Sequence, residues 1–73
     1  MIPREELEIR FTYHAPFGTQ PQKYETIRFN GLNFADMINE LVPDGREKSL
    51  ALTKLDEVVM WANAGIARRD EAE

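Results

Sequence analysis

The chain of 73 residues contains no cysteine and a single histidine, His14. The absence of cysteine excludes disulfide bonds and thiolate metal sites, and one histidine cannot form a multi-histidine site. A single core of this size supplies only about 3–5 kcal/mol, so small chains without disulfides or metal usually gain stability from partners. We therefore expect the chain to assemble into a helical homo-oligomer.

Positive charge is also scarce, because 9 Lys and Arg residues stand against 13 Asp and Glu residues and give a net charge of −4. A general DNA or RNA binder needs a basic surface, so we expect no nucleic-acid polymer as a partner. A local arginine cluster could still hold a small anion. No stretch approaches the roughly 20 apolar residues of a membrane span, and no signal peptide follows Met1. We expect a soluble cytoplasmic protein with no membrane partner.

The most regular pattern lies in the second half, where apolar residues recur every three or four positions from Arg46 to Arg69. This repeat is typical of one face of an amphipathic helix. Asp44 and Glu47 have the spacing of a capping box at its start. The sequence predicts a helix over residues 44–69, followed by an acidic tail over residues 70–73 that we expect to fray.

A second repeat of the same kind runs from Tyr24 to Leu41 and predicts a helix over residues 20–42. Thr19 and Gln22 have capping-box spacing at its start. Asn30-Gly31 is also typical of a β-hairpin turn, but the unbroken repeat on both sides favours a helix that can kink there. A glycine on the apolar stripe allows another helix to approach closely, and the sequence offers the same at Gly65 on the second helix.

Residues 1–19 form a short N-terminal segment and a loop. Pro3 followed by charged residues favours a short helix, whereas the alternation of apolar and polar residues from Leu7 to Tyr13 is typical of a strand. We favour the helix, because an isolated strand would have no pairing partner.

The loop contains Tyr13 and His14 and is punctuated by proline and glycine. Aromatic side chains in a loop need a physical reason. One hypothesis is that Phe11 and Phe17 close the core at one end. The alternative is that Tyr13 and His14 present flat faces to a ligand.

Only residues 43–45 separate the two long predicted helices, so these must run antiparallel as a helical hairpin. The predicted fold is all-α, with a short N-terminal segment on a long two-helix hairpin. This geometry places the start of the first helix beside the end of the second.

Basic side chains gather at that end of the hairpin. Lys23 and Arg28 belong to the first helix, Arg68 and Arg69 to the second, and the loop with Tyr13 enters there too. Arginine forks pair with phosphate and aromatic rings stack on bases, so the cluster suits a phosphate-bearing heterocycle. The alternative is that the two C-terminal arginines complement their own helix dipole and the other two cations are merely solvated.

The sequence offers no catalytic arrangement. His14 has no evident carboxylate to orient it, and no nucleophile has a base nearby. The helices also lack the Glu-x-x-His pairs of di-metal helical bundles. We expect a binding protein, with no enzymatic activity, no cofactor and no metal.

Two stretches, RFTYHAP and PDGREKSLALTKLDEVVMWANAGIARR, resemble a family of bacteriophage proteins. They are similar to the helical-hairpin domain shared by the anti-CBASS cyclic-oligonucleotide sponge and the Thoeris anti-defence sponge. The resemblance covers residues 10–69. It implies a hexamer of hairpin protomers, with pockets between protomers that hold cyclic dinucleotides and separate pockets that hold cyclic trinucleotides. The bound signal is sequestered and not cleaved, so the host effector stays inactive.

The resemblance also implies roles for individual residues. Tyr13 matches the tyrosine that stacks on a base, and Arg28 falls at a basic position that helps enclose the same ligand. Arg69, or its neighbour Arg68, matches the arginine of the trinucleotide pocket. Trp61 is expected to serve packing or an interface.

Two alternatives to this function stay open. A Thoeris-type sponge would hold a cyclic ADP-ribose isomer, but those proteins have a larger N-terminal β-region, and the little that precedes Phe11 favours the anti-CBASS type. The chain could instead be a structural hairpin oligomer or adaptor that binds no nucleotide.

Overall fold

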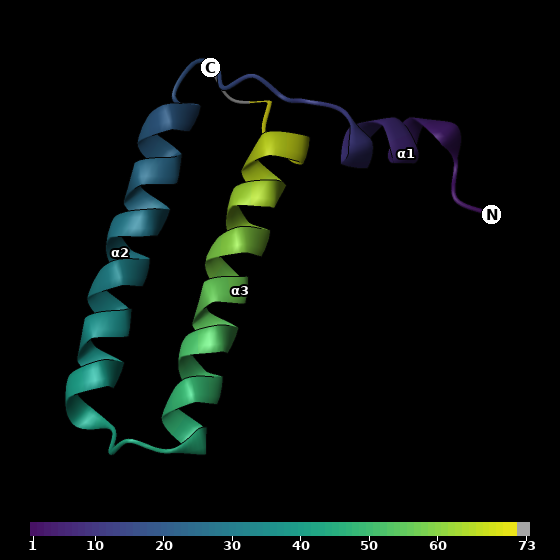
Figure 1. Ribbon diagram of the computed structural model, residues 1–73. Coiled ribbons are helices and arrows are strands. Elements are labelled where there is room, and N and C mark those ends of the chain that lie inside the picture. The colour runs from purple at the N-terminus through teal and green to yellow at the C-terminus, as the bar shows by residue number, and fades with distance from the viewer. Residues whose placement is uncertain (72–73) are drawn as a thin grey trace.

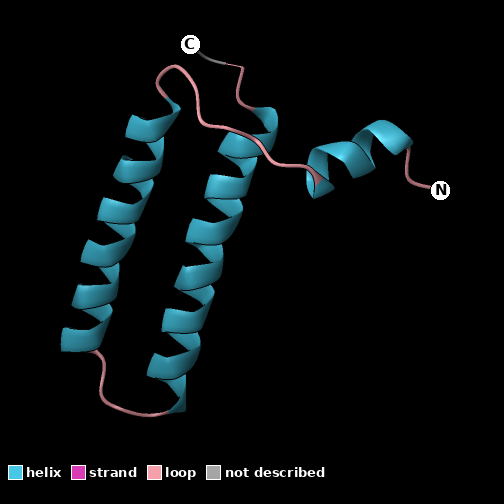
Figure 2. Cartoon of the chain, turned by 45° about the horizontal axis from the view of Figure 1, so that its top comes forward, coloured by secondary structure: helices cyan, strands magenta, loops and turns pink. Residues whose placement is uncertain are grey.

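The computed structural model describes residues 1–71 and consists of three helices joined by two loops. Helix α1 spans Arg4–Phe11, α2 spans Gln20–Leu41 and α3 spans Arg46–Arg69. No strand occurs within residues 1–71, so the all-α prediction and the N-terminal helix are confirmed. Helices α2 and α3 lie side by side and antiparallel, and α1 projects beyond α3 at the open end of the hairpin (Figures 1 and 2).

The two predicted capping boxes are wrong. Thr19 makes no side-chain cap hydrogen bond to α2. At the start of α3 the N-cap position belongs to Gly45, which has no side chain to accept a hydrogen bond from the backbone N–H groups of the first turn. Asp44 therefore lies one residue too early, and its carboxylate instead accepts a hydrogen bond from Lys48 Nζ at 2.9 Å. As a result α3 begins at Arg46 and not at residue 44, and α2 ends at Leu41, one residue before the predicted end.

Helix α2 runs without interruption through Asn30-Gly31. The Asn30 amide donates a hydrogen bond to the Thr26 carbonyl at 2.9 Å, which uses the side chain within the helix. A Cβ atom built on Gly31 would lie only 2.7 Å from Val59 Cγ2 of α3. The predicted close approach at Gly31 is therefore confirmed. At Gly65 a Cβ would meet nothing within 4 Å in the described chain, so no helix of the same chain makes this approach.

The two helices of the hairpin bury little apolar surface between them. The apolar residues that face each other across α2 and α3 are only half-buried, and no hydrophobic residue within residues 1–71 is buried. The overall extents are 45 × 32 × 14 Å, and the smallest is close to the thickness of one helix, about 10–12 Å. The chain is therefore a single layer, whereas stable domains usually bury their apolar faces between two layers. None of the three helices is long and apolar enough to cross a membrane.

Candidate functional site

The open end of the hairpin is closed by Gln20, the one buried residue among residues 1–71, with 1% of its surface exposed. Its Oε1 accepts a hydrogen bond from the Phe17 backbone N–H at 3.2 Å. Its Nε2 donates to the carbonyls of Ile66 at 3.5 Å and Asp70 at 3.1 Å, at the C-terminal end of α3. Gln20 thus joins the loop, α2 and α3. The sequence does not mark this role, because glutamine at the start of a helix is ordinarily a surface residue.

Lys23, a predicted ligand-binding cation, forms an ion pair with the Asp70 carboxylate at 2.9 Å. Its charge is therefore already matched within the chain. The predicted fraying of the acidic tail is wrong for Asp70, whose carboxylate binds Lys23 and whose carbonyl binds Gln20. The last two residues of that predicted tail, 72–73, lie outside the described residues.

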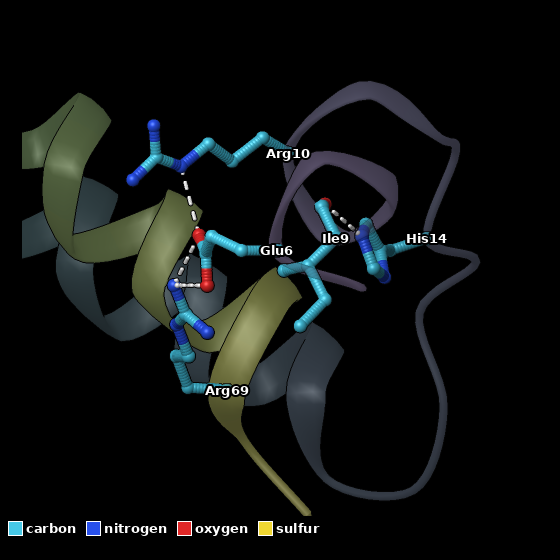
Figure 3. Close-up of polar contacts among 5 residues, drawn as sticks. All are labelled: Glu6, Ile9, Arg10, His14 and Arg69. Atoms are coloured by element: carbon cyan, nitrogen blue, oxygen red, sulfur yellow. Dashed lines mark hydrogen bonds and ion pairs between the residues drawn. The ribbon is translucent and has the colours of Figure 1, made fainter. Parts of the chain in front are cut away.

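Tyr13 and His14 are adjacent in the sequence but lie in different environments. The Tyr13 ring is 86% exposed. His14 is half-buried, and its Nε2 lies 2.6 Å from the Ile9 carbonyl near the end of α1 (Figure 3). Because a carbonyl only accepts, Nε2 must hold the hydrogen. His14 therefore fastens the loop to α1, while Tyr13 is presented to the surroundings.

Phe11 and Phe17 do not close a core in this chain. Both are exposed, at 81% and 51% of their surface. The hypothesis that these two rings close the core at one end is therefore wrong, because residues 1–71 bury neither of them.

Arg28 lies on α2, with its guanidinium carbon 5.6 Å from the centre of the Tyr24 ring, within cation–π range. It lines a pocket of about 310 Å³ between α2 and α3, together with Asp56 and mainly apolar residues. This pocket shares no lining residue with the arginine-rich pocket at the end of α3. The predicted cations therefore do not converge on one site within a single chain.

The second pocket, which we call the arginine pocket, has a volume of about 530 Å³ and lies between the end of α1 and the last turns of α3. Arg68 and Arg69 were predicted from the sequence, but the α1 side of the pocket was not. On α3 the sequence does contain a pattern that places Trp61, Gly65 and Arg68 on one helical face, at spacings of four and three. The full lining is Arg10, Phe11, Trp61, Ala64, Gly65, Arg68 and Arg69.

Glu6 of α1 binds two of these arginines (Figure 3). Arg69 Nη2 lies 2.9 and 2.8 Å from the two Glu6 carboxylate oxygens, and Arg10 Nε lies 2.8 Å from Oε2. The hydrogen bonds from Arg69 and then Arg10 lower the pKa of Glu6 to about 2, and the same contact raises the pKa of Arg69. Glu6 is therefore ionised at neutral pH. Arg10 and Arg69 share the Glu6 carboxylate, whereas Arg68, which lines the same pocket, has no ion pair within residues 1–71.

The family model of the Acb2/Tad1 hairpin domain matches residues 3–67. The chain belongs to this family. The Acb2/Tad1 family is that of the anti-CBASS and Thoeris anti-defence sponges, so the resemblance seen in the sequence is confirmed and the chain falls in a family of anti-defence binding proteins. No curated protein and no solved structure matches the chain significantly.

The Acb2/Tad1 match includes α1 and the loop, so these segments are part of the hairpin domain and not an appendage. It also includes Tyr13, His14, Lys23 and Arg28, and it ends directly before Arg68 and Arg69. Within residues 1–71 no group of three or more His, Asp or Glu side chains is arranged to hold a metal ion.

Proposed function

We propose that the protein is a bacteriophage sponge that binds cyclic di- or trinucleotide immune signals without cleaving them and so prevents activation of CBASS effectors. The observation that supports this most directly is the arginine pocket, where three guanidinium groups and two aromatic side chains line one cavity. Guanidinium forks bind phosphate oxygens, and aromatic faces stack on bases. Sequestration acts on host signals, so the protein works in the host cytoplasm.

The proposal includes a homo-oligomer, and the resemblance implies a hexamer. The single helical layer supports self-association, because residues 1–71 bury no hydrophobic residue and so lack the apolar burial that stabilises a small domain. Pockets at a boundary between copies would also enclose a ligand more fully than the surface of one chain. Tyr13 and Trp61, both largely exposed here, are then available to pockets completed by a neighbouring copy.

Each predicted site residue has a proposed role in this scheme. Tyr13 stacks on a base of a cyclic dinucleotide, and Arg28 encloses the same ligand. Arg68 and Arg69 bind the phosphates of a cyclic trinucleotide. The contacts of His14 with α1 and of Lys23 with Asp70 make these two residues supports of the site, which hold the loop and the start of α2 in place.

A sponge must compete with a dedicated effector, which demands tight binding. A nanomolar dissociation constant corresponds to about 12 kcal/mol. Paired phosphates and stacked bases in a water-excluded pocket can supply free energy on this scale, whereas a shallow surface on one chain would not.

A thermal-melt panel tests the function. It includes cyclic di-AMP, cyclic di-GMP, cyclic GMP–AMP, cyclic triadenylate and a cyclic ADP-ribose isomer, with linear AMP as the control. A ligand at 1,000 times its dissociation constant stabilises the folded protein by about 4 kcal/mol, which raises the Tm of a small domain by several degrees or more.

The identity of the stabilising ligand separates the alternatives. A shift with a cyclic di- or trinucleotide, recovered intact after heat release, supports the anti-CBASS sponge. A shift with the cyclic ADP-ribose isomer alone would indicate a Thoeris-type sponge. Unchanged melts across the panel would contradict the proposal and leave a structural hairpin oligomer.

A further inference from the structure

The Glu6 carboxylate occupies the position at which an anionic ligand would meet Arg69. Arg69 Nη2 contacts both carboxylate oxygens, at 2.9 and 2.8 Å. Carboxylate and phosphate oxygens accept the same charge-assisted hydrogen bonds from a guanidinium group, so the two anions compete for one donor. Arg10 Nε holds Glu6 Oε2 at 2.8 Å, one helical turn away on α1, and so keeps the carboxylate aimed at α3.

Helix α1 is only lightly attached to the rest of the chain. None of its residues is buried, and Phe11 at its end is exposed. Glu6–Arg69 is the one ion pair between α1 and α3 in the part of the chain that the structure describes. A loop of residues 12–19 connects α1 to α2 across the open end of the hairpin (Figure 1). Displacing Glu6 from Arg69 therefore disrupts no packed core.

We propose that Glu6 is an intramolecular competitor for the phosphate groups of the ligand, bound to Arg69 while the arginine pocket is empty and displaced when the ligand enters. This rests on the proposed function, because it assumes a phosphate-bearing ligand at Arg69. Opening frees Arg69 beside Arg68, which has no ion pair within residues 1–71, so the two guanidinium groups then face the ligand together.

The size of the effect follows from the strength of the contact. Apparent affinity is reduced by the fraction of protein in the competent, open state. The Arg69 side chain is 56% exposed and the Glu6 side chain 22% exposed. Ion pairs with this much exposure stabilise the contact they form only modestly. A contact of that class lowers apparent affinity by about two- to sixfold.

The test compares Glu6→Gln with Glu8→Gln, a matched control. Glu8 lies on the same helix, and within residues 1–71 its carboxylate contacts only the exposed Arg4, at 3.3 Å, so its substitution removes the same charge without touching α3. The net charge of the chain changes equally in both variants. We expect Glu6→Gln to bind cyclic triadenylate about two- to sixfold more tightly than Glu8→Gln by calorimetry.

A second readout needs no nucleotide. Trp61 is the only tryptophan of the chain and lines the arginine pocket. Iodide quenches tryptophan on collision and is an anion, so guanidinium groups released from Glu6 raise its local concentration. Quenching by iodide, relative to neutral acrylamide, should therefore increase in Glu6→Gln and stay at the wild-type level in Glu8→Gln.

The outcomes distinguish this inference from the proposed function. Equal or weaker nucleotide binding by Glu6→Gln relative to Glu8→Gln would overturn the competitor role while leaving the sponge intact. Equal iodide quenching in the two variants would overturn it whatever the wild type binds. If the wild type binds no cyclic nucleotide but quenching differs, the proposed function fails, and Glu6 stands as the competitor of another anion.

Discussion

The Tyr13 ring is 86% exposed, although His14 next to it fastens the loop that positions it. We expect Tyr13→Ala to weaken the binding free energy for a cyclic dinucleotide by about 1–3 kcal/mol, the contribution of one stacked base. The oligomeric mass and Tm should stay close to those of the wild type. Titration calorimetry measures the binding, light scattering the oligomeric mass and a thermal melt the Tm. Phe17→Ala, which changes an exposed aromatic of the same loop, is the control. Dissociation of the assembly by Tyr13→Ala would show that the ring serves an interface instead.

Gln20, unlike Tyr13, is buried, and its side chain makes hydrogen bonds within the chain. We expect Gln20→Ala to lower the free energy of unfolding by about 1–3 kcal/mol, since the Phe17 N–H and the carbonyls of Ile66 and Asp70 each lose a hydrogen bond to Gln20 at the open end of the hairpin. Urea unfolding measures this. Gln22→Ala, an exposed glutamine two residues along α2, should change stability little. Equal effects of the two substitutions would contradict the role of Gln20.

At the scale of elements, the contact between α2 and α3 depends on the missing side chain at Gly31. Alanine favours a helix over glycine by about 1 kcal/mol at either Gly31 or Gly65. At Gly31 the new methyl group would lie 2.7 Å from Val59 Cγ2, and valine is stiff at χ1, whereas at Gly65 it meets nothing within 4 Å of the described chain.

We therefore expect Gly31→Ala to be less stable than Gly65→Ala by about 1–3 kcal/mol, the usual cost of overpacking. The comparison cancels the helix-propensity gain that the two variants share, and urea unfolding of both gives the difference directly. A Gly31→Ala protein as stable as Gly65→Ala would mean that the helices separate without cost at this point.

The helices were predictable because their apolar repeats are local, and the short connection at residues 43–45 fixes the antiparallel pairing. The caps were not, since the choice between Asp44 and Gly45 as N-cap depends on one residue of register. The site was predictable only on its α3 side. Glu6 and Arg69 are 63 residues apart, and no periodicity indicates that α1 meets the end of α3.

At the scale of the whole molecule, apolar surface remains on either side of the contact between Gly31 and Val59. One groove of about 310 Å³ includes Leu32, and another of about 220 Å³ includes Phe34. Leu32 is 62% exposed and Phe34 is 51% exposed. A single layer of helices cannot cover both grooves. We propose that further copies of the chain pack against them.

This proposal predicts that stability depends on protein concentration, because association stabilises by mass action. We expect Leu32→Glu to shift the assembly toward single chains and to lower the free energy of unfolding by about 2 kcal/mol or more, the value of a buried leucine side chain. Asn33→Glu places the same charge on the adjacent exposed residue and should leave mass and Tm unchanged, because Asn33 lines neither groove. Light scattering and melts over a hundredfold concentration range measure both properties. A wild type that is a single chain, with a Tm independent of concentration, would mean that the half-buried interface of α2 and α3 suffices alone.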